Sequence, residues 1–152
     1  MRLSRSVRLG VAVLSIAASL AAIGTLGRSA PASASSLKIK CTGLSGNAES
    51  TVSLSGCTGD TGGSSTTLNA ITLYEGGTIY WANGKHTRVS FSLTPGSQGS
   101  CPAGTTEYNG VGTVIGDSTG SAPVDGSASA EGCINDSSYA ITLEPGTKLK
   151  LK

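Results

Sequence analysis

The residues of this 152-residue chain that could carry out catalysis are few and scattered. Nucleophilic catalysis needs a nucleophile, a base and a group that orients the base. Serine and threonine are abundant, but His86 is the only histidine. We expect it to lie on the outer face of a strand, so a hydrolase that uses His86 is the weakest of the functional hypotheses. The sequence therefore favours a protein that is not an enzyme.

Acid–base and metal chemistry receive no more support. No motif pairs two glutamates in the way that glycoside hydrolysis requires. Two Gly-Asp-x-x-Gly-Ser segments, residues 59–64 and 116–121, have the composition of turns and lack the run of carboxylates that a calcium loop needs. The four cysteines form no CxxC pair, and one histidine is too few for a usual zinc site. We therefore expect neither a metal nor another cofactor.

Binding is the better hypothesis, and it centres on a predicted hairpin. Asn83-Gly84 suits the positive φ angles of a type I′ turn. A two-residue loop there would pair Trp81 with His86 and Ile79 with Arg88, and paired residues share a face. These four residues would then form an exposed patch for a protein, a glycan or a small molecule. In the alternative interpretation this face is covered, and Trp81 is the core tryptophan.

The elements that position these residues are short β-like runs. After residue 34 no helical pattern appears, and alternating apolar and polar residues are interrupted by Gly, Asn, Asp and Pro at intervals of about ten residues. The predicted fold is all-β, an antiparallel β-sandwich or barrel of eight to nine short strands. The nine candidate strands are residues 37–41, 51–55, 68–74, 78–82, 85–93, 107–115, 124–134, 139–143 and 148–151. The core face of the central hairpin would carry Tyr80, Ala82, Thr87, Val89, Phe91 and Leu93.

One tetrapeptide occurs twice. Residues 70–73 and 140–143 both read Ala-Ile-Thr-Leu, and each is followed by a Gly-Thr pair and a further predicted strand. A duplicated half-domain would produce this repeat, and so would recurring turn chemistry in a low-complexity β sequence. The sequence leaves both explanations open.

The four cysteines predict two disulfides. We favour Cys41–Cys57 and Cys101–Cys133, since sequential pairing joins neighbouring segments. A turn predicted at residues 117–120 lies midway between the second two cysteines, so their strands should run side by side. The first pair fits a turn near residues 45–47 less well and needs a wider loop, or a Cys57 that lies past the end of its strand.

The first 34 residues have the three parts of a secretory signal peptide. Arginines 2, 5 and 8 form a basic start, residues 9–26 are apolar, and Ala32-Ser33-Ala34 provides small residues for cleavage. The alternative is an uncleaved membrane anchor, but Gly and Thr dilute the apolar run. We expect a signal-peptide helix that touches the membrane only during export and is cleaved after Ala34. The remaining residues, 35–152, would form a single all-β domain that is secreted or associated with the cell envelope.

Removal of the leader reverses the net charge. The whole chain has eleven basic and nine acidic residues, a formal charge of +2. Four of the arginines belong to the leader, which leaves seven basic residues against nine acidic ones, a formal charge of −2. The basic balance of the precursor is therefore no evidence for nucleic-acid binding, and no nucleic-acid partner is expected.

Four stretches carry a resemblance to a known family. They are LSGCTG (54–59), YWANGK (80–85), CPAGTTEY (101–108) and LEPGTKL (143–149). The chain resembles a family of small secreted proteins of uncharacterised function that is common in actinobacteria, and this resemblance implies no activity. In size, disulfide count and richness in Gly, Ala, Ser and Thr the chain is more weakly similar to the enediyne-carrier apoproteins. Those proteins bind a chromophore in an immunoglobulin-like cleft.

Three functions follow as expectations. The first is a secreted or envelope-associated binding module without enzymatic activity. The second is a protease inhibitor that acts through the loop from Gly96 to Gly104, because Cys101-Pro102 is similar to the Cys-Pro beside the inhibitory loop of subtilisin-inhibitor proteins. The third is a small-molecule carrier with an immunoglobulin-like cleft, which the similarity to the enediyne carriers implies.

Overall fold

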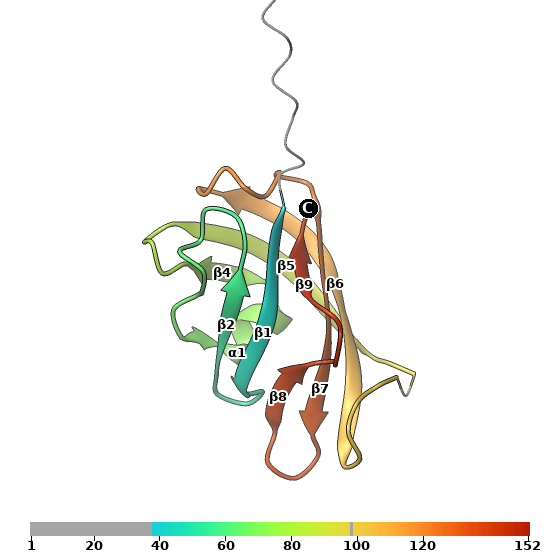
Figure 1. Cartoon of the computed structure of the whole chain (residues 1–152). Helices are drawn as coiled ribbons and strands as arrows, with labels where there is room; N and C mark the ends of the chain where they lie inside the picture. The colour runs from blue at the N-terminus through green and yellow to red at the C-terminus, as the bar shows by residue number, and fades with distance from the viewer. Residues whose placement is uncertain (1–37, 98) are drawn as a thin grey trace, which may run out of the picture. The chain divides into compact units, whose positions relative to one another are not determined.

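The structure is a computed structural model that describes residues 38–97 and 99–152. The predicted signal peptide and its cleavage site lie outside these residues. The described part is an antiparallel sheet of nine strands, which confirms the all-β fold class (Figure 1). The strands are β1 (Ile39–Asn47), β2 (Thr51–Cys57), β3 (Leu68–Asn69), β4 (Gly77–Tyr80), β5 (His86–Pro95), β6 (Thr105–Asp117), β7 (Ser127–Asn135), β8 (Ala140–Leu143) and β9 (Leu149–Leu151). One helical turn, α1 (Ala70–Tyr74), lies between β3 and β4.

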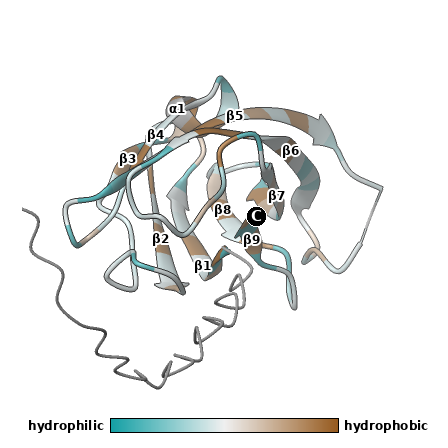
Figure 2. Ribbon diagram, turned by 90° about the horizontal axis from the view of Figure 1, so that it is seen from above, coloured by the Kyte–Doolittle hydropathy of each residue, from teal (hydrophilic) through white to brown (hydrophobic). Residues whose placement is uncertain are grey.

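The strands follow the order β3-β2-β1-β8-β7-β6-β5-β4. Strand β9 also pairs with β1 and β7, so β8 and β9 occupy successive parts of the space between these two strands. Residues 64–66 then join the two ends of the sheet. The Ser65 amide donates to the Leu54 carbonyl on β2, and the Thr66 amide donates to the Tyr80 carbonyl on β4. Seen from above, the strands accordingly follow one another around a ring (Figure 2).

The core lies inside this closed sheet and contains mostly small or medium-sized apolar side chains. Its largest member is Trp81, which is 1% exposed. The indole Nε1–H donates to Thr87 Oγ1 at 2.8 Å, and the Thr87 hydroxyl donates to Asp117 Oδ1 at 2.6 Å. Burial by itself raises the pKa of Asp117, but hydrogen bonds from Thr87, Thr119 and the Ala122 backbone outweigh it, so the pKa is lowered from the usual 3.8. The buried indole is thus connected to an ionised carboxylate.

The hairpin between β4 and β5 has a different register from the predicted one. Tyr80 pairs with His86 and Ile79 with Thr87, while Trp81 N donates to the Lys85 carbonyl. The loop therefore contains three residues, 82–84. Gly84 has a φ of +82°, the left-handed conformation that closes a three-residue hairpin loop. A shift by one residue turns every side chain of a strand to the other face.

This shift corrects the predicted core face. Ile79 and Trp81 join Thr87, Val89 and Phe91 inside the sheet, and Leu93 is half-buried. Tyr80 and Ala82, which were predicted for the core, lie on the exposed face instead. The β5 half of the prediction is therefore confirmed, and the β4 half is wrong.

The strand predicted at residues 68–74 is also wrong for most of its length. Only Leu68 and Asn69 pair with β2, and the chain then forms α1 because the Asn69 side chain accepts a hydrogen bond from the Ile71 amide as an N-cap. The same tetrapeptide at residues 140–143 forms strand β8. The two copies have different secondary structures, which speaks against a duplicated half-domain.

Both predicted disulfides, Cys41–Cys57 and Cys101–Cys133, are present. Cys41 and Cys57 are direct partners in the β1–β2 pair, because the turn lies at residues 48–50 and not near 45–47 as predicted. The Asn47 side chain accepts from the Glu49 amide and so promotes this turn. The turn between β6 and β7 is longer than predicted, and Cys101 precedes β6. Two disulfides in a protein of this size are consistent with an extracellular location.

Candidate functional site

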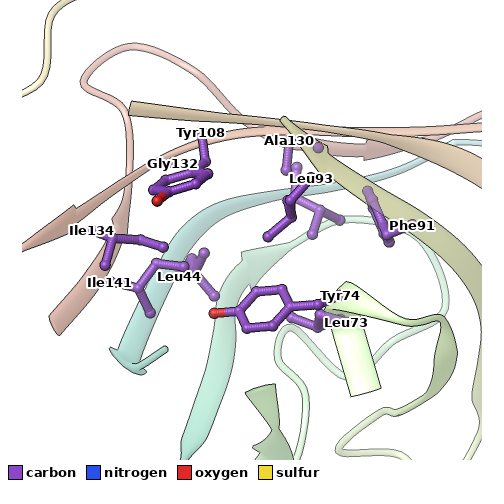
Figure 3. A pocket seen from close by; sticks show the side chains of 12 residues that line it. Leu44, Leu73, Tyr74, Phe91, Leu93, Tyr108, Ala130, Gly132, Ile134 and Ile141 are labelled. Carbon is purple, nitrogen blue, oxygen red and sulfur yellow. The ribbon is translucent and has the colours of Figure 1, made fainter. Parts of the chain in front are cut away.

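An apolar cavity lies between the inner face of the sheet and α1 (Figure 3). The cavity has a volume of about 50 Å³. Since one water molecule needs about 10–15 Å³ of such space, the cavity is on the order of a single six-membered ring. Its walls come from α1 and from strands β1, β5, β6, β7, β8 and β9. The lining residues are Leu44, Leu73, Tyr74, Phe91, Leu93, Tyr108, Gly110, Ala130, Gly132, Ile134, Ile141 and Leu149.

Small residues on β6 and β7 create this space. Gly110 pairs with Ala130, and Tyr108 pairs with Gly132, so both of these β6–β7 pairs on the cavity wall contain a glycine. A Cβ atom on Gly110 would come within 3.1 Å of Cδ2 of Leu93, its partner on the neighbouring strand β5, so even one methyl group there would contact a side chain of the cavity wall. Interiors are usually packed without voids of this size. The cavity is thus the result of missing side chains at positions where strands normally carry them.

The short helix α1 forms the remaining wall and brings Tyr74 into the cavity. Asn69 caps its start, and its end is followed by Gly76, whose φ is +86°. A Cβ atom on Gly76 would lie 2.9 Å from the Val89 carbonyl oxygen, so only glycine lets the helix end pack against β5. Leu73 is buried, and the Tyr74 ring crosses the cavity opposite Tyr108 (Figure 3).

The Tyr74 hydroxyl is buried and has no hydrogen-bond partner among the described residues. Burial raises the pKa of Tyr74, and the neighbouring Tyr108 raises it further. The phenol therefore keeps its proton at neutral pH. Among the described residues that line the cavity, Tyr74 and Tyr108 carry the only polar side-chain groups, their hydroxyls.

A wider hollow of about 340 Å³ forms the mouth of the cavity. The two spaces share Tyr74, Leu93, Tyr108 and Ile134, and the mouth adds Ala48, Asn135, Asp136 and Tyr139. The turn between β7 and β8 forms one rim, and it is tied to the β1–β2 turn by the Ala48 amide, which donates to the Tyr139 carbonyl at 2.8 Å.

Tyr139 has an unusual backbone for a bulky residue. Its φ of 56° lies in the left-handed region, and its side chain is 44% exposed at the mouth. Bulky residues in this conformation cost free energy, and such strain tends to occur at functional sites. The mouth therefore combines an exposed aromatic ring with a strained backbone.

The predicted surface patch is not formed. Ile79 and Trp81 are 0% and 1% exposed, whereas His86 and Arg88 are exposed on the outer face. The one-residue register shift separates the two pairs and leaves His86 beside Tyr80, with ring centroids 6.2 Å apart. Trp81 is instead the core tryptophan of the alternative interpretation.

His86 lies beside Ser118, with Nδ1 and Oγ 3.3 Å apart. The Ser118 hydroxyl also accepts from the His86 amide at 2.8 Å and donates to the His86 carbonyl at 3.0 Å. This hydroxyl thus fixes the turn that follows β6.

The loop predicted to act as an inhibitor, Gly96 to Gly104, is attached to two buried carboxylates. The Gly99 amide donates to Glu107, and the Ser100 amide donates to Glu144 Oε1 at 2.6 Å. Residue 98 lies outside the described residues. Cys101 is joined to β7 by its disulfide. The backbone of this loop is therefore held from several sides.

Within residues 38–97 and 99–152, no cluster of three or more His, Cys, Asp or Glu side chains could hold a metal ion. Over the same residues, no helix is long and apolar enough to cross a membrane.

The cavity and its two tyrosines were not predicted from the sequence. Tyr74 was assigned to a strand, and Tyr108 is separated from it by 34 positions. The available signal was the presence of Gly110 and Gly132 inside strands, where glycine marks a missing side chain or a close approach.

Comparisons of this chain with protein-family models, with curated proteins and with solved structures find no match.

Proposed function

We propose that this chain is an exported, non-enzymatic protein that binds a small apolar molecule in the cavity beneath α1. The observation that carries the proposal is an apolar cavity lined by Tyr74, whose buried hydroxyl has no hydrogen-bond partner in residues 38–97 and 99–152. Ligand sites commonly combine apolar walls with a few polar groups that orient the ligand. The small-molecule carrier expected as an alternative from the sequence thereby becomes the leading hypothesis.

The composition of the walls supports this function. Filling an interior void stabilises a protein, because a larger apolar side chain gains contacts and removes apolar surface from water. Gly110, Ala130 and Gly132 leave the void open on two adjacent strands. Proteins often keep a functional site at the expense of stability, and an open cavity in the core fits this pattern.

Export is supported by the leader pattern and by the two disulfides, which form in oxidising compartments. The burial of Trp81 and Ile79 removes both apolar members of the predicted surface patch, and His86 keeps only Tyr80 as an aromatic neighbour on the exposed face. An interior ligand site is the alternative that the packing favours.

The test is a titration of the purified protein with acetophenone, a one-ring compound, followed by ¹H–¹⁵N NMR. We expect the amide signals of Gly110 and Gly132, which line the cavity, to shift with saturation. Ala130→Leu places a larger side chain in the cavity and should abolish these shifts, and the smaller Ala130→Val should weaken binding. Ser129→Leu is the matched control, because this neighbour on β7 is not part of the cavity wall.

Trp81 emission checks that each variant is folded. The proposal is wrong if wild type shows no saturable shifts, or if folded Ala130→Leu binds as tightly as wild type and Ser129→Leu.

A further inference from the structure

The Tyr74 hydroxyl is the feature that distinguishes this cavity from a simple packing defect. Among the described residues it is the one buried side-chain nitrogen or oxygen atom without a hydrogen-bond partner. A buried polar group left unpaired costs free energy, which a ligand atom can recover by completing the bond. The ligand is therefore expected to place a polar atom beside Tyr74.

The chemistry of this phenol indicates the kind of atom. Burial and the neighbouring Tyr108 both keep Tyr74 protonated, so it offers an O–H donor. The donor is best satisfied by an oxygen acceptor such as a carbonyl or a hydroxyl. In Figure 3 the Tyr74 and Tyr108 hydroxyls lie toward the same side of the cavity, on opposite walls, and the labelled side chains around them are hydrocarbon.

The charges around the cavity indicate that the ligand is neutral. In the part of the chain that the structure describes, no Lys, Arg or His lines either the cavity or its mouth. The mouth contains one carboxylate, Asp136, which already accepts the Thr106 hydroxyl at 2.7 Å. An anion would pass this carboxylate and then lie unpaired against carbon walls, which is strongly unfavourable. A cation would likewise find no partner beneath α1.

We infer that the ligand class is a neutral one-ring compound with a single oxygen acceptor, which receives a hydrogen bond from Tyr74 while its ring lies against Phe91, Leu93 and Ile141. The inference rests on the proposed function and adds the chemical identity of the ligand to it. The size limit follows from the cavity volume, and the part of the ligand beyond the ring would extend into the mouth beside Tyr139.

Three probes of nearly equal shape test the inference. Acetophenone carries a carbonyl oxygen, α-methylstyrene replaces that oxygen by a CH₂ group, and benzoate carries an anion. Each is titrated against wild type and against Tyr74→Phe, which removes the hydroxyl and keeps the ring. Binding is measured from the NMR shifts of Gly110 and Gly132, and Ala130→Leu reports any binding outside the cavity.

We expect the preference for acetophenone over α-methylstyrene, expressed as a ratio of dissociation constants, to fall about 10-fold in Tyr74→Phe. Comparing ratios removes the intrinsic difference in hydrophobicity between the two probes. Benzoate should bind at least about 10-fold more weakly than acetophenone to both proteins.

The outcomes separate the two proposals. If the neutral probes bind in the cavity but Tyr74→Phe leaves their ratio unchanged, or if benzoate binds as well as acetophenone, the ligand class is wrong and the binding function stands. If none of the three probes binds wild type, or if all bind Ala130→Leu equally well, both proposals are wrong.

Discussion

Two hydrogen bonds, from Trp81 to Thr87 and from Thr87 to Asp117, offer a test of how the core is stabilised. Thr87→Val keeps the shape of the side chain and removes the hydroxyl, which is 0% exposed and joins both partners. The indole N–H, inside a side chain 1% exposed, would lose its acceptor, and the Asp117 carboxylate would lose a donor at 2.6 Å. Because Trp81 and Thr87 are buried, water does not replace the acceptor of the indole, whereas the half-buried Asp117 keeps hydrogen bonds from Thr119, Ser121 and Ala122.

The expected loss follows from the two bonds. An unpaired buried donor costs about 1–3 kcal/mol, and a hydrogen bond to a charged group is worth about 1.5–3 kcal/mol. The two terms share one hydroxyl and relax together, so we expect the free energy of unfolding to fall by about 3 kcal/mol at pH 7. That is a large part of the total for a domain of this size, about 5–15 kcal/mol.

The effect should depend on pH because Thr87 helps to lower the pKa of Asp117. A carboxylate whose pKa is lower in the folded than in the unfolded state stabilises the fold above the unfolded value, about 3.9, and this contribution is lost as the pH falls through the folded value. Wild type should therefore lose more stability than Thr87→Val between pH 5 and pH 2. The difference in the free energy of unfolding between the two proteins should therefore shrink at low pH, toward the part that comes from the lost hydrogen bond of the Trp81 indole.

Urea unfolding of both proteins, followed by Trp81 emission at pH 7 and at pH 2, measures these differences. A destabilisation below about 0.5 kcal/mol at pH 7 would show that the hydrogen-bond chain contributes little. An equal destabilisation at both pH values would refute the link to Asp117. Thr66→Val is a suitable control, since the Thr66 side chain is exposed and bonds only a nearby carbonyl.

Three further predictions concern stability and burial. Tyr74→Phe should raise the free energy of unfolding of the ligand-free protein by about 1 kcal/mol in urea, because it removes an unpaired buried hydroxyl; a clear loss would mean that the hydroxyl has a partner in solution. Trp81 should emit at short wavelength and resist acrylamide, given its 1% exposure, and free quenching would contradict its position. Replacing Cys101 and Cys133 by alanine should lower the free energy of unfolding by about 3.7 kcal/mol, and replacing Cys41 and Cys57 should lower it by about 3.1 kcal/mol. The first loss is larger because the sequence separations of the two disulfides are 32 and 16. The reverse order by calorimetry would refute the loop-length argument.

The sequence predicted the fold class and the disulfides because these depend on patterns that survive small errors. Alternation and turn residues locate strands within a few positions, and sequential pairing of Cys41 with Cys57 needs only that β1 and β2 are neighbours. The turn between them was placed about three residues too early, since Gly46 looks like a turn residue but lies within β1. The disulfide tolerates this error because both strands extend beyond it.

The predicted surface patch depended on a single residue of register in the β4–β5 hairpin, which the sequence does not determine. Asn-Gly with a left-handed glycine is compatible with both a two-residue and a three-residue loop, and only the pairing of Trp81 with Lys85 in the folded chain distinguishes them. The choice decides whether Trp81 faces solvent or the core. Similarly, residues 70–73 have β propensity, and the Asn69 cap together with packing against β5 makes them helical.

The position of β1 has a consequence for the order in which the protein folds. Strand β1 starts the described sheet, yet it lies between β2 and the final pair β8 and β9, whose residues follow it by about a hundred positions. The ring closes only when β8 pairs with both β1 and β7, so this late segment must be present before the sheet is complete. Such long-range pairing slows folding to the order of milliseconds to seconds. The β1–β2 hairpin and the β6–β7 pair, each with its disulfide, can therefore form before the sheet closes.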